Sequence, residues 1–236
     1  MTKNIPEGDQ LFTGLTKIEY EDIDKKSDHA SLTKEEVDAA LATSPNGAIF
    51  GSPYYRVPFS VGVSLWNHYA NRKGKFAKWM TKTFGKQPVL MSWVNPELRA
   101  SVARSVLRNH GYFHGQVDFS TVTQKNAKTA KIGYKVQMDS LFRLDSISYI
   151  GYSGHSDSLI HATLADAHIH KGDGFSTASL DAERSRISTL LRNNGYYFYQ
   201  PGYASYLADT FQVDNKVQLR FQLADGLDSR VLRQRA

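Results

Sequence analysis

The stretch Leu191-Arg-Asn-Asn-Gly-Tyr-Tyr197 has a near copy 84 positions earlier, at Leu107-Arg-Asn-His-Gly-Tyr-Phe113. In both stretches a glycine follows an apolar-periodic segment, which is how helices commonly end. Gly111 and Gly195 suit the left-handed position after the last helical turn, because a residue with a Cβ occupies that position only at a cost. The aromatic pair after each glycine would turn the chain back over a core. The stretch therefore predicts the end of a helix in each of two related units.

Further matches on either side of this stretch extend the repeat. Residues 131–138 match 216–223 at an offset of 85, and residues 15–20 match 144–149 at an offset of 129. Between them lies a weaker match at an offset of 123. The fall from 123 to 84 gives the first unit about 39 additional residues, within about 46–94. The chain is therefore one small domain twice, with an insertion in the first copy.

Each copy is expected to run strand, helix, helix, strand, strand, from the periods of its apolar residues. In the first copy we expect a strand at 16–20, a helix opened by the Thr33-Lys-Glu-Glu36 capping box, a helix from Pro96 to Asn109 capped by Asn95, and strands at 116–123 and 131–138. In the second copy we expect a strand at 145–149, a helix at 155–167, a helix capped by Ser176 or Ser179, and strands at 203–208 and 216–223. The predicted fold class is α+β: two tandem βααβ(β) units, each with two helices packed on a three-stranded mixed sheet.

The charge of the chain is concentrated in the insertion. The 236 residues carry a formal net charge of +6 and no cysteine, which excludes disulfides, thiol catalysis and Cys-ligated metal. No acidic residue occurs between Asp38 and Glu97. That stretch holds seven cations: Arg56, Arg72, Lys73, Lys75, Lys78, Lys82 and Lys86. A partner of negative charge is therefore expected to meet the insertion. The polar, Pro-containing N-terminus does not resemble a secretory signal.

The second copy resembles a POTRA domain over residues 143–226. The resemblance rests on the turn Gly172-Asp-Gly-Phe-Ser176 between the helices and on Gly195-Tyr-Tyr197 after the second helix. It makes Gly111, Gly172, Asp173 and Gly195 the expected structural turns. The domains it implies are a first POTRA-like domain at 1–142 with a basic aromatic insertion at about 46–94, a second POTRA domain at 143–228, and a tail at 229–236 toward a further domain.

The enlarged first copy, which follows Asn4-Ile-Pro-Glu-Gly8, resembles the TamL lipoproteins of Bacteroidetes in the BamA/TamA superfamily. It departs from the POTRA pattern because no Gly-Asp turn precedes its second helix. The resemblance implies a lipoprotein signal upstream and a membrane β-barrel downstream. It also implies a non-catalytic scaffold or chaperone-like module of an outer-membrane protein assembly or translocation machine, on the periplasmic face of the outer membrane.

In POTRA domains the strand after the second helix is commonly an exposed edge, to which an extended peptide can add. The resemblance places the candidate peptide-binding edges at Gln116, Val117, Asp118, Phe119, Ser120, Thr121 and Val122, and at Tyr203, Ala204, Ser205, Tyr206 and Leu207. The expected partners are unfolded outer-membrane protein segments and a TamB-like protein.

The insertion contains an amphipathic pattern at Lys75–Phe84, with Phe76 and Trp79 on one helical face and lysines on another. The candidate membrane or partner surface consists of Trp66, Lys73, Lys75, Phe76, Lys78, Trp79 and Lys82. One interpretation is a helix at a lipid surface, with aromatic rings at headgroup depth. The other is a helix packed on its own domain with its lysines in water. Nucleic-acid binding is not expected, because no RNP or KH signature is present.

The sequence gives little support for catalysis, a metal or a cofactor, and we expect none of them. His161, His168 and His170 form the single candidate metal cluster, but residues two apart diverge where a helix enters a turn. The turn Gly172–Gly174 lacks both the Walker pattern and the ligand count of an EF-hand.

Overall fold

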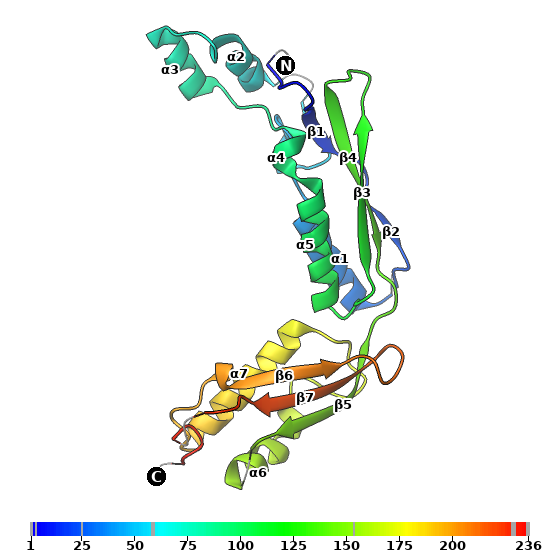
Figure 1. Cartoon of the computed structure of the whole chain (residues 1–236), viewed down its shortest axis with the longest axis vertical. Coiled ribbons are helices and arrows are strands. Elements are labelled where there is room, and N and C mark those ends of the chain that lie inside the picture. The colour runs from blue at the N-terminus through cyan, green and yellow to red at the C-terminus, as the bar shows by residue number, and fades with distance from the viewer. Residues whose placement is uncertain are drawn as a thin grey trace. The chain divides into compact units, whose positions relative to one another are not determined.

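The computed structural model describes residues 2, 4–24, 26–57, 60–152, 154–227 and 230–234. The chain divides into two compact units. Unit 1 comprises Met1–Val106 and Gly115–Asp139, and unit 2 comprises Leu107–His114 and Ser140–Ala236. Each contains one sheet and its own helices (Figure 1). Within the described residues, no helix has the length and apolar character to cross a membrane.

The sheet of unit 1 is built around β4 (Thr129–Gln137), in which buried residues alternate with more exposed ones from Ala130 onward. β3 (Gln116–Thr123) pairs with one side of β4 in antiparallel register. β1 (Leu11–Leu15) and β2 (Glu19–Glu21) both pair with the other side, in parallel. The sheet therefore has four strands in three positions, because its first position is shared by two short strands.

The predicted first strand at 16–20 was wrong. Thr16–Ile18 lies between β1 and β2, and the register with β4 is irregular between Phe12 and Leu15. Leu15 donates its backbone N–H to the carbonyl of Pro53 at 2.8 Å. The insertion thus supplies a partner at the point where the strand breaks.

The two principal helices of this copy are α1 (Asp28–Leu41) and α5 (Pro96–Asn109), which lie together on one face of the sheet (Figure 1). Asn95 caps α5 as predicted, since its side chain accepts from the Leu98 amide at 3.1 Å. The capping box was placed wrongly, because α1 begins at Asp28 after Ser27. Thr33 is therefore interior to the helix and donates to the His29 carbonyl at 2.8 Å. The insertion between the helices forms η1 (Ile49–Gly51), α2 (Val61–Tyr69), α3 (Lys75–Phe84) and α4 (Met91–Val94).

Unit 2 has the strand order β5-β7-β6, with β5 (Arg143–Ile150) parallel and β6 (Ala204–Asp209) antiparallel to β7 (Lys216–Leu223). The predicted helix at 155–167 is α6 (His155–Ala162) followed by the 3-10 turn η2 (Leu164–Asp166). α7 (Thr177–Asn193) is capped by Ser176, and η3 (Pro201–Tyr203) precedes β6. The core includes Leu144, Ile160, Leu180, Ile187, Leu191, Tyr199, Val217, Leu219 and Phe221.

The two sheets repeat one arrangement, since the first strand is parallel and the strand after the second helix antiparallel to the last strand. This confirms the predicted α+β class. The domain limits at 142 and 228 stay predictions. In the predicted tail, residues 229, 235 and 236 lie outside the described residues, and so does residue 228 at the preceding boundary.

Candidate functional site

β3 is the outer strand on its side of the unit 1 sheet. It pairs with β4 from Gln116 to Thr123, and the described strands include none on its other side. Its side chains are exposed at every position except Val117. Phe119 and Val122 remain 42% and 46% exposed although they are apolar. An extended peptide at this edge would therefore find both main-chain groups and apolar side chains.

The ladder fixes which main-chain groups of β3 point outward. The carbonyl of Ile132 accepts from the Thr16 amide, so Ile132 directs its backbone groups toward the first strand position. Because these directions alternate along a strand, Gly133 directs its groups toward β3 and its partner Ser120. The N–H and C=O groups that point away from the sheet therefore belong to Val117, Phe119, Thr121 and Thr123.

β6 is the corresponding outer strand of unit 2. The carbonyl of Asn215 accepts from the Arg143 amide at 3.1 Å, so the odd-numbered residues of β7 face β5. The even-numbered ones face β6 and pair there with Ser205, Leu207 and Asp209. The outward main-chain groups of β6 belong to Ala204, Tyr206 and Ala208. The predicted Tyr203 lies in η3, just before the strand begins.

The insertion occupies the opposite edge of the unit 1 sheet. Phe12 donates to the carbonyl of Val89 at 2.8 Å, and Met91 donates to the carbonyl of Gln10 at 2.9 Å. Together with the bond from Leu15 to Pro53, these contacts satisfy main-chain groups of β1 and of Gln10, the residue before it. β2 is three residues long and carries two glutamates, features that discourage strand addition.

The Gly-Asp turn satisfies outer main-chain groups at the start of β5, the first strand of unit 2. Leu144 donates to the carbonyl of Asp173 at 2.8 Å and accepts from the Gly172 amide at 2.7 Å. Arg143 forms a bridge with Gly174. The sequence identified this turn from its resemblance to POTRA domains, but gave no indication that it covers the start of the β5 edge.

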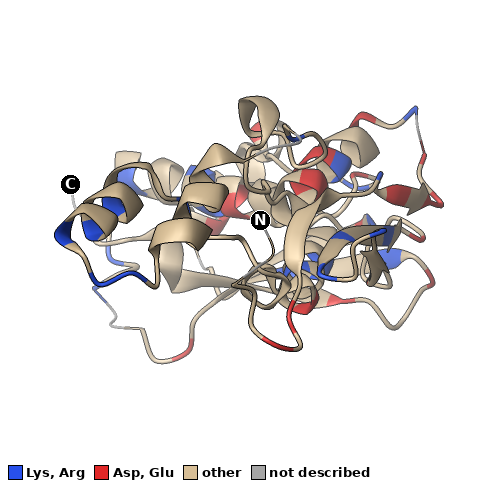
Figure 2. Ribbon diagram, turned by 90° about the horizontal axis from the view of Figure 1, so that it is seen from above, with Lys and Arg blue, Asp and Glu red and all other residues tan. Residues whose placement is uncertain are grey.

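A second candidate surface lies on α2 and α3. Four rings contact one another in succession: Tyr69 and Phe76 have centroids 6.1 Å apart, Phe76 and Trp79 5.9 Å, and Trp79 and Phe84 5.7 Å. α3 carries lysines and no acidic residue (Figure 2). We call Tyr69, Phe76, Trp79 and Phe84, together with Lys75, Lys78 and Lys82, the basic aromatic ridge. The predicted Lys73 lies between the two helices, and Trp66 is partly buried on α2.

The rings of α3 are not packed into the core of unit 1. The buried residue of α3 is Ala77, at 5% exposure, whereas Phe76 and Trp79 are 62% and 53% exposed. The buried residue of α3 is therefore a small one, and the three rings of this helix face solvent. Phe59, an aromatic residue of the insertion, lies outside the described residues.

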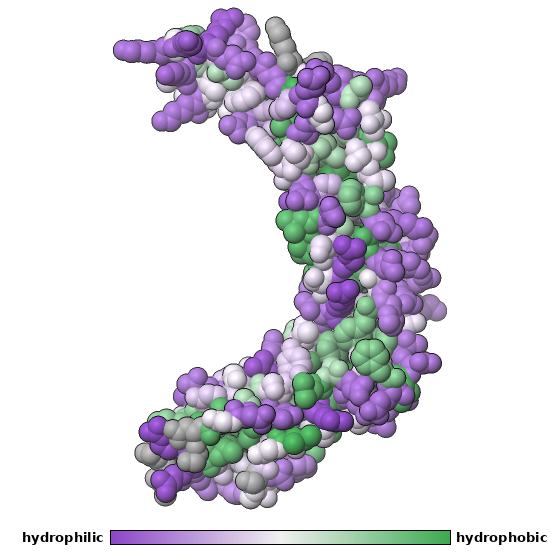
Figure 3. Space-filling view, viewed as in Figure 1, coloured by the Kyte–Doolittle hydropathy of each residue, from purple (hydrophilic) through white to green (hydrophobic). Residues whose placement is uncertain are grey.

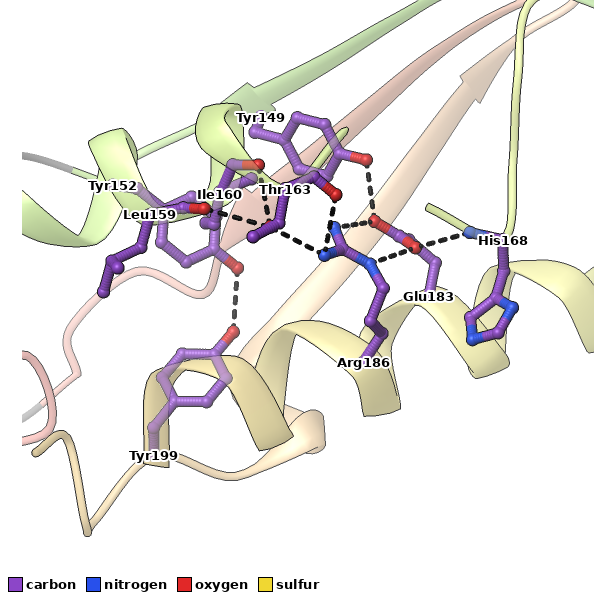
Figure 4. Close-up of polar contacts among 9 residues, drawn as sticks. All are labelled: Tyr149, Tyr152, Leu159, Ile160, Thr163, His168, Glu183, Arg186 and Tyr199. Carbon is purple, nitrogen blue, oxygen red and sulfur yellow. Dashed lines mark hydrogen bonds and ion pairs between the residues drawn. The ribbon is translucent and has the colours of Figure 1, made fainter. Parts of the chain in front are cut away.

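Glu183 is the buried carboxylate of unit 2, and its surroundings show that it is structural. It accepts from the Tyr149 hydroxyl at 2.8 Å, from the His168 amide at 2.9 Å, and from Arg186 at 2.7 and 2.9 Å (Figure 4). Burial alone would raise the pKa of Glu183, but these hydrogen bonds outweigh it and hold that pKa below its ordinary value. A carboxylate with both oxygens occupied is poorly suited to proton transfer. Among the described residues, no three His, Cys, Asp or Glu side chains are placed to hold a metal ion.

No protein-family model and no curated protein matches the chain. Three solved structures to which it is similar come from BamA or Omp85 proteins. The POTRA3-5 fragment of Haemophilus influenzae BamA is 12% identical, with a TM-score of 0.45, over 95% of this chain and 70% of that one. BamA from Haemophilus ducreyi lacking POTRA domains 1-3 is 18% identical, with a TM-score of 0.38, over 67% and 26%. POTRA1-3 of Omp85 from Anabaena is 11% identical, with a TM-score of 0.30, over 62% and 56%.

Proposed function

We propose that the chain is a periplasmic scaffold module that binds extended polypeptide segments by strand addition at β3 and β6. One observation carries the proposal: each unit has a segment hydrogen-bonded to the outer side of its first strand, along β1 in unit 1 and at the start of β5 in unit 2. The described residues place no such segment on the strand after the second helix. In unit 1 the bonded segment is the insertion, and in unit 2 it is the turn at 172–174. Different segments thus produce the same outcome in the two units.

Strand addition suits a protein that binds many different polypeptides, because main-chain hydrogen bonds supply affinity without requiring a particular sequence. Exposed apolar side chains beside the open edges, Phe119 on β3 and Leu207 on β6, would favour alternating segments of unfolded outer-membrane proteins. We propose such segments as clients and a TamB-like protein as a partner. The resemblance to TamL lipoproteins supports a place on the periplasmic face of the outer membrane.

The test is a proline that removes one outward N–H and no ladder hydrogen bond. Thr121→Pro does this on β3 and Ala208→Pro on β6, and edge strands tolerate proline at such positions. The matched controls are Thr121→Ala and Ala208→Ser, which keep the N–H. The probe is a labelled peptide with the alternating sequence of an outer-membrane barrel strand, followed by fluorescence anisotropy.

We expect each proline to weaken binding at its own edge and each control to leave binding nearly unchanged. The double proline variant should bind least. Unchanged binding by the double variant, with native circular dichroism, would exclude strand addition at these edges.

A further inference from the structure

We propose that the basic aromatic ridge docks the chain onto the surface of an anionic phospholipid bilayer. This inference does not rest on strand addition, because α2 and α3 share no residue with β3 or β6. It assigns a ligand of another class to a second surface. The observations behind it are the exposure of the rings, the sign of the surrounding charge and the geometry between the rings.

The rings form a continuous apolar strip that is exposed to solvent. Phe76, Trp79 and Phe84 are each more than half exposed, and Tyr69 links them to α2. A contiguous exposed apolar strip of this kind marks an interaction site. In Figure 3 the side chains over α2 and α3 are mostly hydrophilic, with apolar ones among them. That mixture is what the boundary between headgroups and acyl chains accommodates.

The charge next to the rings is of one sign. Lys75, Lys78 and Lys82 lie on the flank of α3 that adjoins Trp79, at positions three and four residues apart. Arg72 extends the positive charge and lies over the Tyr69 ring at 5.4 Å. No acidic residue occurs between Asp38 and Glu97, so nothing within this stretch neutralises these cations. Anionic headgroups are the complementary surface, with each nearby lysine contributing about 1 kcal/mol.

The ring geometry favours lipid over nucleic acid. Tyr69 meets Phe76 at an interplanar angle of 83°, and Trp79 meets Phe84 at 85°. An edge-to-face pair places the edge of one ring against the face of the other, so the faces that bases would stack on are partly occupied. Insertion of ring edges among lipid headgroups needs no free face. The same cluster is therefore better suited to a bilayer than to a single strand.

The experiment is co-sedimentation with phosphatidylcholine vesicles that contain or lack phosphatidylglycerol. We expect binding to the anionic vesicles alone, and a decrease with added salt. Lys78→Glu/Lys82→Glu should weaken it at least about thirtyfold, from about 1 kcal/mol per lysine. The matched control is Lys125→Glu/Lys128→Glu in the β3–β4 turn, which changes net charge equally at two exposed lysines and should bind nearly as the parent does.

A second measurement reports the rings. In a Trp66→Phe/Trp93→Phe variant, Trp79 is the one remaining tryptophan of the sequence. Its emission should shift to the blue when anionic vesicles are added. Equal loss of binding in the two charge-reversal variants would overturn the proposal, as would sedimentation without a Trp79 shift. Binding of single-stranded RNA or DNA, lost in Lys78→Glu/Lys82→Glu, by a chain that ignores vesicles would also overturn it. Peptide binding at β3 and β6 should be the same in all these variants, so failure here and failure of strand addition are separable.

Discussion

The Tyr149 hydroxyl donates a 2.8 Å hydrogen bond to a Glu183 carboxylate that has no exposed surface. This bond joins strand β5 to helix α7 in unit 2. Arg186 pairs with the same carboxylate and also donates to the Thr163 hydroxyl at 2.9 Å, at the end of α6 (Figure 4). The network therefore connects the sheet to both helices that cover it, in the unit whose open edge is β6.

Removing the charge of Glu183 should destabilise unit 2. We expect Glu183→Gln to lower its free energy of unfolding by about 3 kcal/mol, because Arg186 would stay nearly buried opposite a neutral group. Tyr149→Phe removes one hydrogen bond and should cost about 1–2 kcal/mol. The measurement is urea unfolding followed through the NMR amide signals of α7. A loss under 1 kcal/mol in Glu183→Gln would show that the pair contributes little.

The same network should make unit 2 sensitive to acid. Because the pKa of Glu183 is lower in the folded chain, its contribution is complete above the unfolded pKa of about 4.3 and is lost as the pH falls through the lower folded value. We expect the difference in unfolding free energy between the parent and Glu183→Gln to be constant near neutral pH and to shrink below about pH 4. The same urea titrations, repeated across this range, provide the check. A difference that grew on acidification would have the wrong sign for this account.

Short sequence patterns predicted many of the helices and strands. The sequence placed the helix at Lys75–Phe84 and the strand at Gln116–Thr123 with the bounds that the structure shows, because capping, period and turn signals lie within a few residues. Contacts between distant segments were not accessible. Nothing near residues 11–20 indicates that Pro53 and Val89 would satisfy that strand and divide it.

At the candidate site, too, contacts between distant segments could not be predicted from the sequence. The position of the open edges followed from the resemblance, but the cover on the opposite edges depends on long-range main-chain bonds that leave no sequence pattern. Glu183 and Arg186 are three apart on a helix, a spacing that usually indicates a surface ion pair. The partners that surround this pair are distant in the sequence: Tyr149, for example, lies 34 positions from Glu183.

Tyr134 offers a contrast with Tyr149 in the other unit. Its ring is 2% exposed in the core of unit 1, and burial raises its pKa to about 12. Its hydroxyl makes no hydrogen bond with any described residue. We therefore expect Tyr134→Phe to change the unfolding free energy of unit 1 by less than about 1 kcal/mol, and Tyr134→Ala to cost about 3–5 kcal/mol through the cavity it leaves. Tryptophan fluorescence in urea measures this, since Trp66, Trp79 and Trp93 all belong to unit 1. A loss above 2 kcal/mol in Tyr134→Phe would reveal a role for the hydroxyl.

Replacing the turn glycine Gly111 should cost more than replacing the turn glycine Gly172. Its φ is +82°, and a Cβ there would lie 2.9 Å from the carbonyl oxygen of Phe175, a backbone atom that has little freedom to move. Gly172 has a φ of +95° but nothing within 4 Å of its Cβ position. Both residues belong to unit 2, so the pair separates backbone strain from steric overlap.

We expect Gly172→Ala to cost about 1 kcal/mol, the conformational penalty alone. Gly111→Ala should cost at least about 1 kcal/mol more, because the Phe175 backbone must shift and the bond from the Phe142 amide to the Gly111 carbonyl is strained with it. The α7 amide signals in urea report both variants on one scale. Equal losses of unfolding free energy in the two variants would mean that the Phe175 backbone can shift at little cost. Gly111 would then be needed at this turn only because of its positive φ.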